Sequence, residues 1–215
     1  MVERPMKNSI LIPVSIVVAG IIIAVAVVYK QSEKSLYLEL ANDIGLNREQ
    51  FKTCVEDRVY RTEIEKDYAD GVAAGVTATP TTFIGGVAIR GAYPYENYKE
   101  AIEAALSGAK ILPHDPTIIW PTVDDDAVLG DLSAPVTMIV FGDFECPYCS
   151  QAFKTSEAQI RKEYVETGKV KMIYRDFPIA GHLSAIPAAE AAGCAHEQGK
   201  YWEYHDALFE NQDRL

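Results

Sequence analysis

Two cysteines separated by two residues, Cys146-Pro147-Tyr148-Cys149, carry the clearest chemistry in the sequence. They open a helical pattern, so Cys146 is predicted to stand at a helix N-terminus, where backbone N–H groups and the helix dipole lower the pKa of a thiol. Pro147 fits the first turn because its missing N–H is no loss there. Cys149, one turn further in, can reach back to form a disulfide. We assign Cys146 as the exposed reactive sulfur and Cys149 as the buried resolving sulfur.

The alternative interpretation of this pair is half of a structural zinc site. A four-cysteine zinc site needs a second closely spaced pair, whereas Cys54 and Cys194 lie alone on separate predicted helices. The spacing therefore favours redox chemistry, with no metal and with the Cys146–Cys149 disulfide as the only redox group. An even count of four cysteines also favours a structural disulfide between Cys54 and Cys194, and two separate buried thiols are the alternative.

Composition limits the class of protein. The chain has 215 residues, of which 48% are hydrophobic and 24% charged, which suits one globular domain with an appendage. Its formal net charge is -11, and no Lys/Arg-rich block is present. Because phosphate contacts need clustered basic side chains, nucleic acid is not an expected partner.

The N-terminal residues predict the compartment. Arg4 and Lys7 precede an uncharged apolar run of the length that a helix needs to cross a membrane. We assign residues 1–8 to the cytoplasm, residues 9–29 to a transmembrane anchor, and everything after Lys30 to the outside. A cleaved signal peptide is the alternative, since Ala24-Val25-Ala26 resembles a cleavage site. Either origin places the rest of the chain where disulfides persist.

Residues 30–107 are predicted to form helices followed by a hairpin and a helix. Apolar residues recur every four positions before Gly45, and Asn47 with Gln50 reads as a capping box for the next helix. That helix is expected to bury Phe51, Cys54, Val55 and Val59. A third helix over residues 60–74 precedes two short apolar runs joined by Gly85-Gly86, which indicates a tight hairpin. A further helix ends at Gly108.

Residues 108–135 are predicted to be a connector. Its part from residue 109 to residue 135 holds four prolines, and we expect a short edge strand at Ile118 to Trp120 and a solvated run from Asp124 to Asp126. Residues 136–215 then read as a buried strand, the helix opened by the cysteine pair, a second strand near residues 169–177, and helices over residues 187–198 and 200–211.

Moving residues 136–215 in front of residues 33–107 gives the element order of a thioredoxin fold with a helical insertion. "APVTMIVFGDFECPYC", "YRDFP", "AAEAAGCAHEQGKYWEYHDALFENQ" and "TATPTTFIGG" resemble the DsbA family of extracytoplasmic thiol-disulfide oxidoreductases, in permuted order. The resemblance implies an α/β, thioredoxin-like fold with an inserted helical block, circularly permuted and preceded by one transmembrane helix. A fragment of a tandem repeat is the alternative, and it could fold within one chain or as a domain-swapped homo-oligomer. CPYC also occurs in glutaredoxins, which are short cytosolic proteins without the export segment or the helical block.

The resemblance also implies how the site is built. Pro80 is predicted to be cis, so that the Thr79 backbone faces the cysteines and can bond an extended peptide beside Pro147 and Tyr148. Many relatives carry a buried carboxylate six residues before the first cysteine, but here that residue is Val140, which leaves the proton route of Cys149 unnamed. Tyr148 brings no positive charge, which predicts a weaker oxidant than a CPHC site.

Other polar residues near the site receive lesser roles. Asp143 and Glu145 are expected only to adjust the local potential. His182 is expected to make a loop or helix-start hydrogen bond, while Trp202 and its neighbours on that helix belong to core and surface.

The predicted function is a membrane-anchored thiol-disulfide oxidoreductase that introduces disulfides into exported proteins. Its partners would be exported substrates with free thiols and a quinone-linked membrane protein that reoxidises the pair, as the resemblance implies. A reductase or isomerase using the same cysteines and a non-catalytic peptide-binding remnant are the alternatives.

Overall fold

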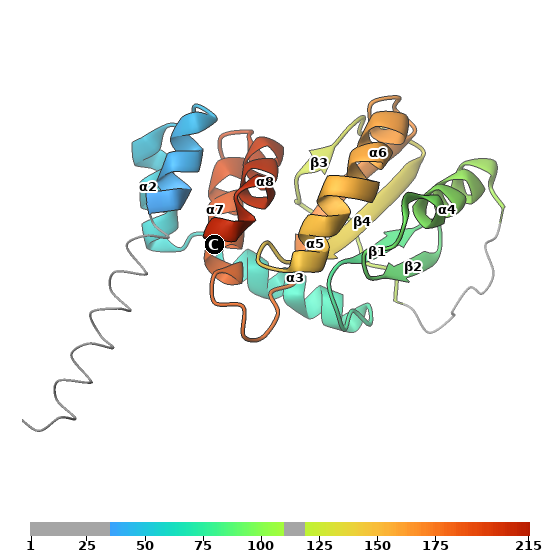
Figure 1. The fold of residues 1–215 in the computed structure, drawn as a ribbon, viewed down its shortest axis with the longest axis horizontal. Helices are drawn as coiled ribbons and strands as arrows, with labels where there is room; N and C mark the ends of the chain where they lie inside the picture. The colour runs from blue at the N-terminus through green and yellow to red at the C-terminus, as the bar shows by residue number, and fades with distance from the viewer. Residues whose placement is uncertain (1–34, 110–118) are drawn as a thin grey trace, which may run out of the picture.

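A computed structural model describes residues 35–109 and 119–215 of the chain, and its strands form a five-stranded sheet (Figure 1). The strand order is β2-β1-β4-β5-β3. The strands are β1 (Thr81–Ile84), β2 (Val87–Arg90), β3 (Val128–Leu129), β4 (Val136–Gly142) and β5 (Val170–Asp176). Strands from both ends of the chain therefore share one sheet.

The contact between β1 and β4 joins the two parts of the sequence. β1 runs antiparallel to β4, from Thr81 opposite Phe141 to Ile84 opposite Met138. β4 in turn runs parallel to β5, and β2 completes the predicted hairpin with β1 through Gly85 and Gly86, which have φ values of 55° and 93°. These positive values explain the two glycines, because other residues rarely adopt them.

Alternate residues of the central strands enter different parts of the core. Met138 and Val140 of β4 belong to one buried cluster, which also contains both cysteines of the pair. Ile139 and Phe141 belong to a second cluster. Since successive side chains of a strand point to opposite faces, β4 is covered on both faces, as its unbroken apolar sequence predicts.

Helices on both sides of the chain's midpoint form a helical block. It consists of a helix over residues 35–43, α2 (Arg48–Asp57), α3 (Arg61–Ala73), α7 (Ala185–His196) and α8 (Tyr201–Glu210). In Figure 1, α2, α7 and α8 stand together on one side of the molecule, while β2 and α4 (Tyr95–Ser107) lie on the other. The C-terminal residues join the block, since Arg214 forms an ion pair with Glu39 (2.8 Å).

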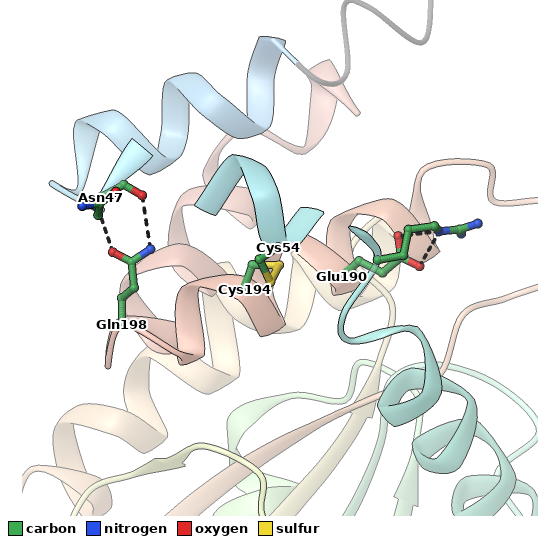
Figure 2. Close-up of a disulfide and its surroundings, with 6 residues drawn as sticks. Asn47, Cys54, Glu190, Cys194 and Gln198 are labelled. Atoms are coloured by element: carbon green, nitrogen blue, oxygen red, sulfur yellow. Dashed lines mark hydrogen bonds and ion pairs between the residues drawn. A yellow bond between two sulfur atoms is a disulfide. The ribbon is translucent and has the colours of Figure 1, made fainter. Parts of the chain in front are cut away.

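The disulfide between Cys54 and Cys194 links α2 to α7 (Figure 2). These cysteines are 140 residues apart in the sequence, and their Cα atoms are 5.8 Å apart. Gln198 lies beyond the end of α7 and receives a hydrogen bond from the backbone N–H of Asn47 (2.7 Å), the N-cap of α2. The disulfide therefore holds together segments from the two ends of the sequence.

The start of α2 follows the predicted cap, but its end differs from the prediction. Asn47 accepts a hydrogen bond from the backbone N–H of Gln50 (3.0 Å), and Phe51 and Cys54 are buried. Val59, predicted to be on the same apolar face, is 54% exposed. Its exposure has a local cause, because Arg58 ends the helix in the left-handed region and turns the chain away.

The connector differs from the prediction in two places. Residues 119–120 form no strand, and residue 118 lies outside the described residues; the edge strand is β3, which pairs antiparallel with β5. Asp124 to Asp126 were expected to be solvated, yet the side chain of Asp126 is only 9% exposed beside Arg175. Asp124 forms an ion pair with Lys66 (2.6 Å). The buried Arg175 draws these carboxylates inward.

The predicted cytoplasmic segment (residues 1–8) and transmembrane anchor (residues 9–29) lie outside the described residues. Within residues 35–109 and 119–215, no helix is both long enough and apolar enough to cross a membrane.

Candidate active site

Cys146 is the N-cap of α5 (Pro147–Ala152), as the sequence predicts. Its backbone is extended (φ −73°, ψ 122°), and Pro147 opens the helix where no N–H is needed. The helical path continues from Phe153 to Val165, partly as π-helix. The backbone N–H of Cys149 donates to the carbonyl oxygen of Cys146 (3.1 Å), which sets the two sulfurs one turn apart.

The loop before β1 lies directly against the cysteine pair. The Thr79–Pro80 bond is cis, as predicted, and Cys146 Sγ is 3.5 Å from the carbonyl oxygen of Thr79. Cys146 was expected to be exposed, but it is buried, with only 5% of its surface exposed, because this loop covers it. Tyr148, between the two cysteines, is 62% exposed.

The two thiols have opposite acidities. The pKa of Cys146 is lowered to about 5, first by the hydrogen bond from the Cys149 thiol and then by the side chain of Thr79 and the backbone N–H groups of Cys149 and Tyr148; burial opposes the shift. Burial raises the pKa of Cys149 well above its ordinary value, and Cys146 raises it further. Cys146 is therefore the sulfur that carries the negative charge in the reduced pair.

Asp143 anchors the turn that leads into Cys146. Its side chain is fully buried and accepts hydrogen bonds from the backbone N–H groups of Glu145 and Ile179 (both 2.8 Å). It also lies 2.8 Å from Nδ1 of His182. Burial disfavours the protonated form of His182, but the hydrogen bond and charge of Asp143 outweigh this and raise its pKa. His182 thus makes the predicted loop contact, while Asp143 and its partners connect the loop after β5 to the reactive turn.

Gln212, near the C-terminus, is a contact that sequence reasoning missed. Its side-chain amide donates to the carbonyl oxygens of Phe144 (2.8 Å) and Cys146 (2.9 Å). A single amide side chain gives no pattern that would identify this role in advance. The last residues of the chain therefore support the turn at the cysteine pair.

A second cluster of polar side chains surrounds Arg175 of β5, and sequence reasoning did not identify it either. The buried Arg175 donates to Asp67 (2.6 Å) and Asp70 (3.0 Å). Carboxylate oxygens of Glu63, Asp67 and Asp126 lie within 4.8 Å of one another, a donor set that suits a hard cation, although Arg175 already supplies positive charge there. Burial, followed by the charge of Asp67, raises the pKa of Asp126 to about 9.

Two family models match this chain, one before the connector and one that begins within it. Residues 27–103 match the DSBA-like thioredoxin domain, and residues 122–215 match a thioredoxin family model. The described residues therefore form a mixed α/β, thioredoxin-like fold of the DsbA type.

Individual relatives share part of the chain. Na(+)/H(+) antiporter NhaA 3 of Salinispora tropica is 45% identical over 93 residues, which are 43% of this chain and 14% of the antiporter. Probable disulfide bond formation protein D of Bacillus cereus is 35% identical over 88 residues, which are 40% of each protein. The crystal structure of α-DsbA1 from Wolbachia pipientis has 30% identity and a TM-score of 0.39, covering 43% of this chain and 45% of that one. The chain thus spans less than half of each of these proteins.

Proposed function

We propose that this chain is a membrane-anchored, extracytoplasmic oxidoreductase that introduces disulfides into exported proteins. The observation that carries the proposal is the pairing of two unlike thiols beneath the Thr79–Pro80 loop. Cys146 has a pKa of about 5 and lies 3.5 Å from the Thr79 carbonyl, while the pKa of Cys149 is raised by burial. Such an arrangement favours reaction of substrate thiols at Cys146 and keeps Cys149 as the protonated, resolving sulfur.

The oxidised pair would react in two exchange steps. A substrate thiolate attacks Sγ of Cys146 and forms a mixed disulfide, while the Cys146–Cys149 bond breaks and Cys149 leaves with the electron pair. The second substrate thiolate then attacks the substrate sulfur and releases Cys146 as a thiolate. The substrate loses two electrons and the pair gains them. The low pKa of Cys146 makes it a good leaving group in the second step.

The surface around Cys146 suits an extended substrate. The Thr79 backbone lies beside Cys146 at the start of β1, where a peptide can add main-chain hydrogen bonds. Tyr148 and Leu183 are 62% and 76% exposed, and both belong to segments that border the reactive turn. Apolar side chains of an unfolded substrate would contact them.

Turnover would require a partner that accepts electrons from the reduced pair. The family resemblance supports a membrane protein that passes them to quinone, and an anchor at residues 9–29 would keep the catalytic domain next to it. Oxidation of substrates, rather than their reduction, depends on such a partner.

We also infer that the fold is a circular permutant of a DsbA-like domain. In support, β1 pairs with β4 in one sheet, and Arg214 contacts Glu39 in the first described helix. The test is a reordered chain in which residues 136–215 precede residues 33–107. It should fold and react like the original chain; a reordered chain that does not fold would contradict the inference.

The proposed activity is tested with a reduced, unfolded protein that contains two cysteines. The oxidised full chain should convert its thiols to a disulfide, and a Cys146→Ala variant should not. A parallel insulin-reduction assay tests the opposite direction. If the full chain oxidises the substrate no faster than Cys146→Ala does, the proposal is wrong; if only insulin reduction exceeds the control, the direction is wrong.

A further inference from the structure

The apolar residue Val140 stands where many relatives have a carboxylate, and its neighbour on the next strand is a tyrosine. Val140 of β4 is opposite Tyr174 of β5 in the parallel ladder. Both side chains belong to the buried cluster that contains Cys146 and Cys149. Because residues in register share a face of the sheet, Tyr174 approaches the cysteine pair from the same side as Val140.

The hydroxyl group of Tyr174 is buried and lacks a hydrogen bond. Tyr174 is 3% exposed, and its oxygen has no hydrogen-bond partner among the described residues. Its ring packs against Phe144 and His205, at centroid distances of 5.1 Å and 4.7 Å. A buried hydroxyl without a partner destabilises a fold, whereas phenylalanine would fill the same space without that penalty. Packing alone therefore does not explain the oxygen.

Gly142 leaves the space that the hydroxyl occupies. A Cβ atom at this position would clash with the oxygen of Tyr174. Gly142 has a negative φ, so backbone conformation does not require glycine here. The close approach of Tyr174 gives a reason for the glycine.

The Tyr174 hydroxyl therefore lies against Gly142, at the start of the turn that leads to the cysteine pair. Asp143 follows Gly142 directly, and its backbone N–H is among the groups that lower the pKa of Cys149 against the larger effect of burial. Burial raises the pKa of Tyr174, and among charged neighbours the thiolate of Cys149 raises it most. The Asp143 carboxylate is already engaged by Glu145, Ile179 and His182, so it is not a free partner for the sulfur.

We propose that the Tyr174 hydroxyl donates a hydrogen bond to the Cys149 thiolate as the Cys146–Cys149 bond opens. This inference rests on the proposed function. When a substrate thiolate bonds to Cys146, Cys149 leaves with the electron pair of the broken bond into a buried site. Tyr174 keeps its proton while donating, and Cys149 afterwards takes up one proton from solvent.

The test is Tyr174→Phe in the full chain, which removes one oxygen atom. The rate at which dithiothreitol opens the Cys146–Cys149 disulfide is measured over a series of pH values. Loss of a hydrogen bond to a charged group should slow opening by about 10-fold or more. The melting temperature should stay the same or rise, because the variant no longer buries an unpaired hydroxyl.

Tyr204→Phe is the matched control. Tyr204 is also buried, but its hydroxyl donates to the carbonyl oxygen of Tyr37 (3.0 Å) in the helical block. This variant should lose stability and keep the wild-type rate of disulfide opening. A merely structural role of Tyr174 would give the same result as the control, with lower stability and an unchanged pH profile.

Three outcomes would overturn the inference: a wild-type rate and pH profile in Tyr174→Phe, equal slowing in both variants, or failure of Tyr174→Phe to fold. Failure of the proposed function is a separate result. If dithiothreitol opens the Cys146–Cys149 disulfide of the wild-type chain but the chain does not oxidise protein substrates, the proposed function is wrong. The opening rates of Tyr174→Phe and Tyr204→Phe still test the hydrogen bond in that case.

Discussion

The two cysteine pairs of this chain show how surroundings decide what a sulfur does. Cys54 and Cys194 are 140 residues apart, lie on the apolar faces of α2 and α7, and form a disulfide. Cys146 and Cys149 are one turn apart at the start of α5, beneath the Thr79–Pro80 loop. Both pairs are buried, so burial does not distinguish them.

The difference lies in the polar groups that each sulfur meets. Cys146 receives donors from the first turn of α5 and from Thr79, which lower its pKa to about 5. Cys54 and Cys194 connect two helices of the block and have the partner sulfur as their distinctive contact. A cysteine at a helix N-terminus is therefore reactive, whereas cysteines on the apolar faces of two helices form a lasting crosslink.

The largest expected effect comes from Cys149→Ala. Without the resolving sulfur, Cys146 can still attack or be attacked, but the pair can no longer store two electrons. Catalytic turnover of thiol substrates should fall to the level of the uncatalysed reaction, as a thiol-oxidation assay would show. Cys146 should remain reactive toward iodoacetamide; loss of that reactivity would mean that the variant has damaged the fold instead.

Removal of the other pair should act on stability alone. A Cys54→Ala/Cys194→Ala variant loses a crosslink over a long loop, and its free energy of unfolding should fall by about 2–5 kcal/mol. Urea unfolding without reductant measures this change. The alkylation rate of Cys146 should stay unchanged, and a marked change would show that the two pairs are coupled.

The pH dependence of Cys146 separates the pairs without mutation. Iodoacetamide should alkylate the reduced chain with a midpoint near pH 5, because the thiolate is the reactive form. The pKa of Cys146 in the folded chain lies below its ordinary value of 9.0. The thiolate therefore contributes its full stabilisation of the reduced fold above pH 9.0, and this contribution is lost as the pH falls through about 5. A midpoint near the ordinary value would contradict the role of Cys146.

The smallest effect is expected beside the disulfide. Gln198→Ala removes the hydrogen bonds to the backbone of Asn47 shown in Figure 2. Because these bonds are exposed, unfolding should become easier by only about 1 kcal/mol. Denaturant titration with the disulfide intact measures the effect. A loss as large as that of the double cysteine variant would show that the crosslink contributes little by itself.

Local patterns in the sequence predicted most of the fold. The glycines at 85 and 86, the N-cap Asn47 and the apolar run of β4 specify their elements through nearby residues alone. The position of Pro80 against Cys146 required the family resemblance, since no periodicity relates segments so far apart.

What the sequence did not predict depends on long-range burial. Asp126 reads as part of a solvated acidic run until Arg175, buried and distant in sequence, is placed beside it. The cover over Cys146 comes from the other part of the chain, so its burial could not be seen from its own neighbours. Gln212 likewise reaches the reactive turn from the C-terminal end.

The crosslink between residues 54 and 194 has a consequence for a chain that has been cut. A protease that cleaves one peptide bond anywhere between these positions produces two fragments that remain covalently attached. Such nicked material would migrate as one species until a reductant releases the pieces. The backbone across the connector is therefore not the only covalent link between the segments that carry β1 and β4.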